Sequence, residues 1–270
     1  MKKLNNKPFD KIRREIKRLT IEMCHKSKTG HIGSALSISD ILAVLYFKVM
    51  KINPRKPLDP KRDRFILSKG HGSASLYATM ALRGYFGVNE LNKYRVDNGR
   101  FHGHPCFEAS DGIEVSTGSL GHGLPIGTGM ALSLRKTSPK SKVYVLMGDG
   151  ECQEGSVWEA AMFGFTHKLN NLVVIVDANG FQGLGKTKDI QSRPLHLIWK
   201  GFGWNVISCD GHSVDSLMKA LAQTNKSSVP SVIIAKTIAG IGVPLIEDSL
   251  RAHYHVLKES EYAEIIKTLK

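Results

Sequence analysis

The sequence contains few cysteines and no paired cysteine motif. Four cysteines are scattered without a C-x-x-C pair, at Cys24, Cys106, Cys152 and Cys209. This pattern indicates neither a zinc site nor a disulfide framework. No apolar run approaches the length of a membrane span, and the amino-terminal Met-Lys-Lys-Leu-Asn-Asn-Lys lacks the apolar segment of a secretory signal. These absences predict a cytoplasmic protein with reduced thiols and no membrane association.

Acidic residues are scarce relative to basic ones. The chain has 38 Lys and Arg against 24 Asp and Glu, a formal net charge of +14. The excess is concentrated in residues 1–18, with eight basic and two acidic side chains, and in residues 48–64, with seven and two. Neither stretch has the interleaved aromatics or the recognised module of a nucleic-acid-binding protein. The charge therefore favours phosphorylated substrates or an acidic partner protein over nucleic acid.

Segments of helical and strand periodicity alternate along the 270 residues. Apolar spacing predicts a first helix that begins near Phe9 and ends near Thr29-Gly30. Further helices are predicted at 41–50, 73–85, 124–136, 154–169 and 214–223. Ser39-Asp40 is suited to cap the helix at 41–50. Short apolar runs predict strands at 64–68, 142–147, 172–177, 205–209 and 231–236. Strands separated by helices predict a three-layer α/β fold, a mostly parallel sheet with helices on both faces. Because no linker divides residues 1–270, we expect one domain.

Two of the predicted strands end in polar turns. The apolar run 143–147 is followed by Gly-Asp-Gly, and the run 172–176 by Asp-Ala-Asn. The 28 residues from Glu151 to Ala178 suffice for one crossover helix between parallel strands. Both turns then lie at the carboxyl edge of the sheet, where α/β proteins bind ligands. There the Asp149 carboxylate and the Asn179 carbonyl can share one hard cation, and the glycines let backbone approach a diphosphate.

Glycine-flanked histidines recur in the turns between the predicted elements. Four such turns contain His31, His71, His104 and His122. A single histidine is usually a surface or satisfied core residue, but a series in successive loops of an α/β protein favours a shared role. A neutral imidazole moves protons near physiological pH, and an imidazolium pairs with phosphate. The residues alone thus predict an enzyme with an anionic ligand.

The order of these motifs resembles the amino-terminal portion of transketolase, which binds the diphosphate of thiamin diphosphate. The resemblance runs from about Ile12 to His253. It rests on Ser-Lys-Thr-Gly-His-Ile-Gly at 27–33, Asp-Arg-Phe-Ile-Leu-Ser-Lys-Gly-His-Gly at 63–72, Gly-His-Pro at 103–105, Thr-Gly-Ser-Leu-Gly at 117–121, Gly-Asp-Gly at 148–150 and Asp-Ala-Asn at 177–179. In such enzymes the cofactor carries the carbanion chemistry, and the protein supplies orientation, a metal and acid–base groups.

The resemblance implies a site for thiamin diphosphate and for Mg²⁺ or Ca²⁺. The residues that match the metal ligands are Asp149, Asn179 and, through its backbone carbonyl, Phe181. The residues that match cofactor contacts are His71, Gly118, Leu120, Gly150, Asn179 and His253. Of these, His71, Gly150 and His253 match the lining of the diphosphate, whereas Gly118 and Leu120 match backbone contacts near the aminopyrimidine.

The resemblance also implies catalytic residues. Those that match histidines around the reacting sugar are His31, His71, His104 and His253, which steer proton transfers and contact hydroxyls. Glu154 and Glu159 match carboxylates buried at a subunit interface, where they are proposed to relay protons between paired active sites. Ordinary helix salt-bridge partners are the alternative role for both glutamates.

Three positions and one segment depart from the common transketolase pattern. His122 replaces a glutamine, Ile32 replaces the proline of His-Pro-Gly, and Tyr254 replaces a glycine that follows the last histidine. The segment Phe181–Thr187 differs from the usual continuation. These changes fit a specialised sugar enzyme as well as central pentose phosphate metabolism.

The segment Gly180–Thr187 also satisfies the P-loop pattern G-x-x-x-x-G-K-T. A P-loop requires a long helix immediately after the Lys-Thr pair, with its amino terminus on the phosphates. Pro194 disrupts any such helix, and Asn179 is already required by the thiamin motif. We therefore disfavour a nucleotide triphosphatase.

The resemblance implies a partner. Transketolase chains continue into a pyrimidine-binding domain whose glutamate promotes formation of the thiamin ylid, and this chain shows no counterpart of that domain. We expect the amino-terminal subunit of a split enzyme that moves a two-carbon ketol unit from a ketose, which we expect to be phosphorylated, to an aldose. The partner would be a pyrimidine-domain subunit, and two copies of each would form a heterotetramer.

Two other functions remain open from the sequence. One is a different thiamin diphosphate enzyme subunit, of the 2-oxo-acid decarboxylating or deoxyxylulose-phosphate type. The other is a non-catalytic paralogue that retains the fold. The glycine-flanked histidines argue against the second, because a structural protein gains little from them.

Overall fold

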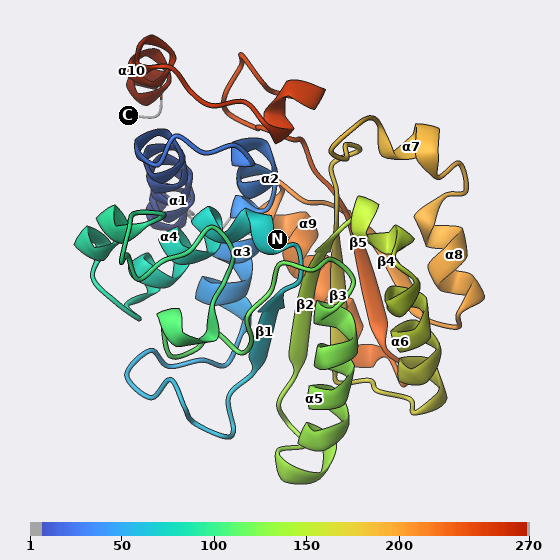
Figure 1. Cartoon of the computed structure of the whole chain (residues 1–270). Helices are drawn as coiled ribbons and strands as arrows, with labels where there is room; N and C mark the ends of the chain where they lie inside the picture. Colours follow the sequence, from blue (N-terminus) through green and yellow to red (C-terminus); the bar gives the residue numbers. More distant parts are fainter. Residues whose placement is uncertain (1–6, 269–270) are drawn as a thin grey trace.

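The computed structural model describes residues 7–268, and within them the strands form one five-stranded sheet (Figure 1). The strands lie in the order β1-β2-β3-β5-β4, and every neighbouring pair is parallel. Their bounds are Arg64–Leu67 for β1, Val143–Gly148 for β2, Leu172–Ala178 for β3, Asn205–Asp210 for β4 and Ser231–Lys236 for β5. The predicted α/β fold with a parallel sheet is confirmed. The amino-terminal residues used to exclude a secretory signal, and the first part of the basic stretch 1–18, lie outside the described residues.

Helices cover both faces of this sheet, as predicted (Figure 1). The α-helices are α1 Lys7–Lys26, α2 Ile32–Ser37, α3 Ser39–Val44, α4 Ser73–Arg83, α5 Gly123–Thr137, α6 Gly155–Thr166, α7 Thr187–Ile190, α8 Leu195–Gly201, α9 Val214–Gln223 and α10 Glu259–Thr268. The shorter helical turns that matter below are η1 Leu45–Val49, η3 Val88–Lys93 and η7 Leu250–His253. α5, α6 and α8 pack on one face, and α1, α3, α4 and α9 belong to the hydrophobic layer on the other.

Alternate residues of the central strands enter the two hydrophobic layers. In β2, Tyr144 and Leu146 pack in the layer of α3 and α9, whereas Val143, Val145 and Met147 pack in the layer of α5 and α6. Both strand faces are buried, because a parallel sheet with helices on each side leaves no face to solvent. In β2 and β3 the polar residues of the Gly-Asp-Gly and Asp-Ala-Asn turns therefore lie at the carboxyl ends of the strands.

The helix predicted at 41–50 begins earlier and is interrupted. α2 precedes it, α3 begins at Ser39 and covers its first four residues, and the segment ends in the π-helical turn η1. The predicted Ser39-Asp40 cap is wrong, because neither side chain caps α3. Asp40 is instead fully buried, and its carboxylate accepts hydrogen bonds from Arg13, Lys17 and His212. A buried charge of this kind needs several partners, and they join α3 to α1 and to the loop after β4.

The segment Ile32–Val49 has the length and composition of a membrane span, so the expectation that no apolar run approaches this length is wrong. Its 18 residues have a mean hydropathy of 1.6, and 83% of the segment is buried inside the structure. Asp40 in its middle is ion-paired with Arg13 and Lys17. The segment is apolar because it forms core beneath α1 and α4.

After β5 the chain returns to the start of α2. Apolar spacing did not predict α2. η7 contacts α2, and the His31 N–H donates to the His253 carbonyl at 2.7 Å. A Cβ on Gly33 would lie 2.3 Å from the Ala252 Cβ, so only glycine permits this approach. The same contact places His253, the last of the predicted site histidines, next to His31, the first.

Candidate active site

A pocket of about 390 Å³ lies at the carboxyl edge of the sheet, the upper edge in Figure 1. The loops after β1, β2 and β3 and the connection between α4 and α5 form it together with α2, η7 and the residues next to them. The predicted site residues that line it are His31, His71, His104, Gly118, Leu120, Asp149, Gly150, Glu154, Asn179, Phe181 and His253. Glu159 is the one predicted site residue that does not. The structure thus brings together residues spread over more than 200 positions of the chain.

Asp149, at the end of β2, is buried and accepts three hydrogen bonds. The Gly150 N–H donates to Oδ1, and the Gly180 N–H and Thr187 hydroxyl donate to Oδ2, each at 2.9 Å. A carboxylate has about four lone-pair positions, so Oδ1 retains an open one. Burial, and then the nearby Asp177 charge, raise the pKa of Asp149 to about 6. A bound cation would offset both effects.

Asn179, at the end of β3, is oriented by two hydrogen bonds. Its Nδ2 donates to Asp177 Oδ2 at 3.0 Å, and its Oδ1 accepts from the Phe181 N–H at 3.0 Å. Oδ1 keeps a second lone pair. Residues 7–268 contain no group of three or more His, Cys, Asp and Glu side chains that could hold a metal. A mixed set of carboxylate, amide and backbone carbonyl oxygens, of the kind that Mg²⁺ and Ca²⁺ accept, remains the candidate.

A buried ion pair that the sequence did not reveal supports Asn179. Lys69 Nζ pairs with Asp177 Oδ2, and the two side chains are 1% and 0% exposed. The hydroxyls of Ser37 and Thr237 also donate to this carboxylate. Removing one member of such a buried pair strongly destabilises a protein, because the other charge is left without a partner. The pair therefore fixes the position of Asn179.

Gln182 is a second residue that the sequence did not single out. A Cβ on Gly150 would lie 2.8 Å from Gln182 Cγ, so glycine is needed for this contact. Gln182 Nε2 is buried and has no hydrogen-bond partner within the part of the chain that the structure describes. An unsatisfied buried donor is destabilising unless a ligand accepts from it. Its place in the pocket beside Gly150 fits an anionic ligand such as a diphosphate.

Three of the predicted histidines form a cluster. The ring centroids of His31 and His71 lie 5.3 Å apart, those of His31 and His253 5.0 Å, and those of His71 and His253 5.8 Å. His31 has a φ of 66°, which non-glycine residues rarely adopt. Its Nδ1 is buried and lacks a partner among residues 7–268. Strain and an unsatisfied nitrogen together are typical of a residue held in place for function.

Burial lowers the pKa values of His31, His71, His104 and His253, which favours their neutral forms at physiological pH. Burial, followed by the charges of neighbouring histidines, lowers the pKa of His31 to about 4. Burial, with the Lys69 charge second, lowers the pKa values of His71 and His253, that of His71 most strongly. Burial also lowers the pKa of His104. Neutral imidazoles can accept protons from a substrate hydroxyl, which imidazolium cannot.

Glu151, also missed at the sequence level, is a buried carboxyl group of the pocket lining. Its Oε1 accepts from the Ser68 hydroxyl and from the Gly121 N–H at 2.9 Å, and its Oε2 accepts from the Gly148 N–H at 3.1 Å. Burial raises the pKa of Glu151. These bonds join the ends of β1 and β2 to the loop that contains Gly118 and Leu120. Its position immediately after the Gly-Asp-Gly turn could have identified Glu151 as a pocket residue from the sequence.

Glu154 and Glu159 are both exposed in the single chain. Glu154 lines the pocket, and Glu159 lies one helical turn further along, on α6. Their predicted role at a subunit interface stays a prediction.

The P-loop-like segment Gly180–Thr187 folds as a small hairpin. Phe181 and Lys186 form an antiparallel bridge, and the Gln182 N–H donates to the Gly185 carbonyl at 2.8 Å. The helix that follows, α7, has four residues. The long phosphate-binding helix of a P-loop protein does not follow, as predicted.

Comparison with known proteins identifies the family of this site. Residues 10–269 match the model described as "Transketolase, thiamine diphosphate binding domain". The chain belongs to the transketolase family. The resemblance predicted from the six motifs is thereby confirmed, as is a thiamin-diphosphate-dependent transferase.

Two transketolase relatives match this chain along nearly their whole length. It is 39% identical over 257 residues to a subunit of the 6-deoxy-6-sulfo-D-fructose transketolase of Clostridium sp. (strain MSTE9), covering 94% of each chain. It is 37% identical over 270 residues to a subunit of the apulose-4-phosphate transketolase of Actinobacillus succinogenes, covering 98% of each chain. Human transketolase is 38% identical over 255 residues, which are 93% of this chain and 40% of the human one.

Solved transketolase structures share the fold. That from Leishmania mexicana superposes with a TM-score of 0.91 at 30% identity, over 97% of this chain and 41% of the other. That from Campylobacter jejuni has a TM-score of 0.91 at 33% identity, over 99% of this chain and 43% of the other. The present chain thus spans about two fifths of the full-length enzymes.

Proposed function

We propose that this chain is the diphosphate-binding subunit of a two-polypeptide transketolase, with residues 1–270 as one binding domain. It would move a two-carbon ketol unit from a phosphorylated ketose to an aldose. The observation that carries this proposal is one pocket that combines four neutral histidines with the Asp149 and Asn179 oxygens. A separate partner is supported by relatives of matching length that are named as subunits.

The cofactor site would use the oxygen ligands at the ends of β2 and β3. Mg²⁺, or Ca²⁺, would be held by Asp149, Asn179 and the Phe181 carbonyl. The diphosphate would be held by His71, Gly150, Gln182 and His253, and the aminopyrimidine by backbone at Gly118 and Leu120. When bound, thiamin diphosphate supplies the carbon nucleophile that protein side chains lack.

The histidines would handle the protons of the sugar. As a C–C bond of the ketose breaks, a hydroxyl proton must leave, and a neutral imidazole within hydrogen-bond reach can take it. His31 is suited to this step because its buried Nδ1 has no partner among the described residues. His104 would contact the remaining hydroxyls, and the same groups would return protons to the acceptor product.

Assembly would bury the carboxyl edge and α6. Glu154 directly precedes α6 and Glu159 lies on it, and this helix also exposes Met162 and Phe163, which are 51% and 41% accessible. Large exposed apolar side chains mark interaction surfaces. We propose a heterotetramer of two copies of this chain and two pyrimidine-domain subunits, located in the cytoplasm, where the four free cysteines would stay reduced.

The test is ketol transfer from a pentulose phosphate to an aldose phosphate, with protein freed of host transketolase. The chain alone should bind thiamin diphosphate weakly and show no turnover, and adding the pyrimidine-domain polypeptide should produce activity. Robust turnover by the chain alone would reject the two-polypeptide enzyme. A complex that binds the cofactor yet transfers no ketol unit from any ketose phosphate would reject the reaction.

A further inference from the structure

A second cavity, of about 310 Å³, lies at the amino edge of the sheet. It sits where β1 and β2 begin, between the end of η1 and the last turns of α9. Its charged lining residues are Lys48, Lys51, Lys140, Lys142 and Asp63. Four lysines against one aspartate leave a net charge of three positive. The active-site pocket is at the opposite edge, so the proposed ketol transfer does not use this cavity.

Asp63 holds two of these lysines side by side. Its buried carboxylate accepts from the Lys51 N–H on Oδ2 and from the Lys142 N–H on Oδ1, both at 2.8 Å. Each carboxylate oxygen thus binds a backbone amide, and the structure records no ion pair between Asp63 and a lysine among residues 7–268. The two backbones are fixed, and their side chains border the cavity.

None of the four lysines is ion-paired within the described part of the chain. Lys142 Nζ donates to the neutral oxygens of Asn225, at 2.6 Å, and Thr224, at 3.3 Å. Lys48 Nζ lies 4.3 Å from the centroid of the Phe9 ring. The side chains of Lys51 and Lys140 are exposed. Apart from Asp63, no acidic residue of the described chain lines this cavity, so most of its positive charge is not compensated locally.

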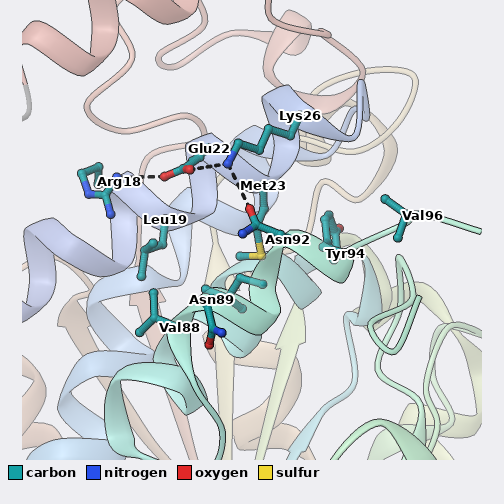
Figure 2. Close-up of a pocket in the computed structure, with 11 residues that line it drawn as sticks. Arg18, Leu19, Glu22, Met23, Lys26, Val88, Asn89, Asn92, Tyr94 and Val96 are labelled. Carbon is teal, nitrogen blue, oxygen red and sulfur yellow. Dashed lines mark hydrogen bonds and ion pairs between the residues drawn. The ribbon is translucent and has the colours of Figure 1, made fainter. Parts of the chain in front are cut away.

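The hollow between α1 and η3 shows the contrasting case (Figure 2). Its cations, Arg18 and Lys26, both pair with Glu22, at 2.8 and 2.6 Å. Lys26 also donates to Asn92 at 3.0 Å. Charges satisfied in this way create little attraction for an anion, so we assign no ligand to that hollow.

The lining of the amino-edge cavity includes Val49, Tyr144, Met218 and Leu221, which we call its apolar floor. We propose that this cavity binds a small organic phosphate, separate from the substrate. Its phosphate would meet the ammonium groups of the lysines, and its apolar part would pack on the floor. The cavity volume is at the lower end of the roughly 300 to 1,000 Å³ of small-molecule sites, which favours a compact ligand.

The test uses phenyl phosphate as the probe and the full chain in EDTA, so that the metal-dependent site is inactive. Calorimetry should show saturable binding of one phenyl phosphate per chain. Lys51→Gln with Lys140→Gln should weaken it at least tenfold. Both side chains are exposed, so the fold should survive, which circular dichroism checks. The matched control is Lys200→Gln with Lys267→Gln, exposed lysines on α8 and α10, and it should stay within twofold of the parent.

Three outcomes would overturn the proposal. The first is no saturable binding, or binding that the two lysine substitutions leave unchanged. The second is inorganic phosphate bound as tightly as phenyl phosphate, because the apolar floor would then contribute nothing. The third is a poly-glutamate peptide bound more tightly than phenyl phosphate, which would make the edge a docking surface for an acidic protein. If the double variant unfolds, Lys140→Gln alone should still weaken phenyl phosphate at least threefold.

Discussion

The two edges of the sheet differ in how their charged side chains are paired. At the carboxyl edge, Lys69 and Asp177 are buried as an ion pair, and the histidines are neutral. At the amino edge, Asp63 binds backbone amides and the lysines around it stay unpaired in the described residues. A general base must be unprotonated before the reaction begins, and burial, which lowers the pKa values of these histidines, favours that state. The large positive charge of the chain therefore belongs to its surface and to the amino edge, not to the catalytic pocket.

The largest expected effect comes from breaking the carboxyl edge at Asp149. With the pyrimidine-domain partner present, Asp149→Ala should abolish Mg²⁺-dependent binding of thiamin diphosphate in calorimetry, because the only carboxylate of the oxygen set is lost. Asp189→Ala, an exposed acid on α7, is the matched control and should bind normally. Unchanged affinity in the Asp149 variant would remove this residue from the metal site.

A smaller effect is expected from His104, which should act on the sugar more than on the cofactor. His104→Ala should lower kcat/KM. The decrease should correspond to a loss of about 2–4 kcal/mol of transition-state stabilisation, as is usual for one preorganised group near developing charge. Its affinity for thiamin diphosphate should change little. His196→Ala, an exposed histidine on α8, should leave both quantities unchanged. Normal kcat/KM in the His104 variant would exclude it from the substrate site.

The raised pKa of Asp149 predicts an acid limit on cofactor binding. Metal binding needs the carboxylate, so with a pKa of about 6 the affinity should fall about tenfold between pH 7 and pH 5. His31, with a pKa of about 4, stays neutral over this range. In the cofactor-free chain the raised pKa of Asp149 has the opposite effect on folding stability, because protonation of Asp149 stabilises the folded state. This contribution is complete below about pH 4 and is lost as the pH rises through 6. Affinity that stays level from pH 7 to pH 5 would contradict the assignment.

The smallest expected effect concerns Lys186, which lies in a hairpin and is followed by only the four-residue helix α7. Equilibrium dialysis with labelled ATP should show no saturable binding at micromolar nucleotide, in either the parent chain or Lys186→Ala. Tight ATP binding that Lys186→Ala removes would restore the P-loop interpretation.

Much of the scaffold could be predicted because it follows from local pattern. The runs 142–147 and 172–177 are continuous and apolar, as buried parallel strands require, and their polar turns located the pocket. α8 escaped prediction because its seven residues are too few to show a clear period. α10 was also missed, although its ten residues equal the length of the predicted α9. The start of the 41–50 helix was misplaced, because a buried aspartate such as Asp40 looks like a cap until its distant partners are known.

The histidines and the Gly-Asp-Gly turn of the pocket were also identifiable, since each stands in a recognisable local motif. Lys69 with Asp177, Glu151 and Gln182 were not. Each depends on a partner from another loop, and burial, which no single segment encodes, decides whether such a side chain is a surface charge or part of a site. The order of the motifs identifies most residues that line the pocket. It does not identify the buried residues that position them.

The hydrogen bond from the His31 N–H to the His253 carbonyl has a consequence for how the molecule comes into being. During synthesis the first of these residues leaves the ribosome long before the second, and the five strands lie between them. Contacts between distant parts of a chain form late in folding, because they require the longest loops to close. We therefore expect the sheet and helices of a newly made chain to form first, and the histidine cluster of the pocket to form last.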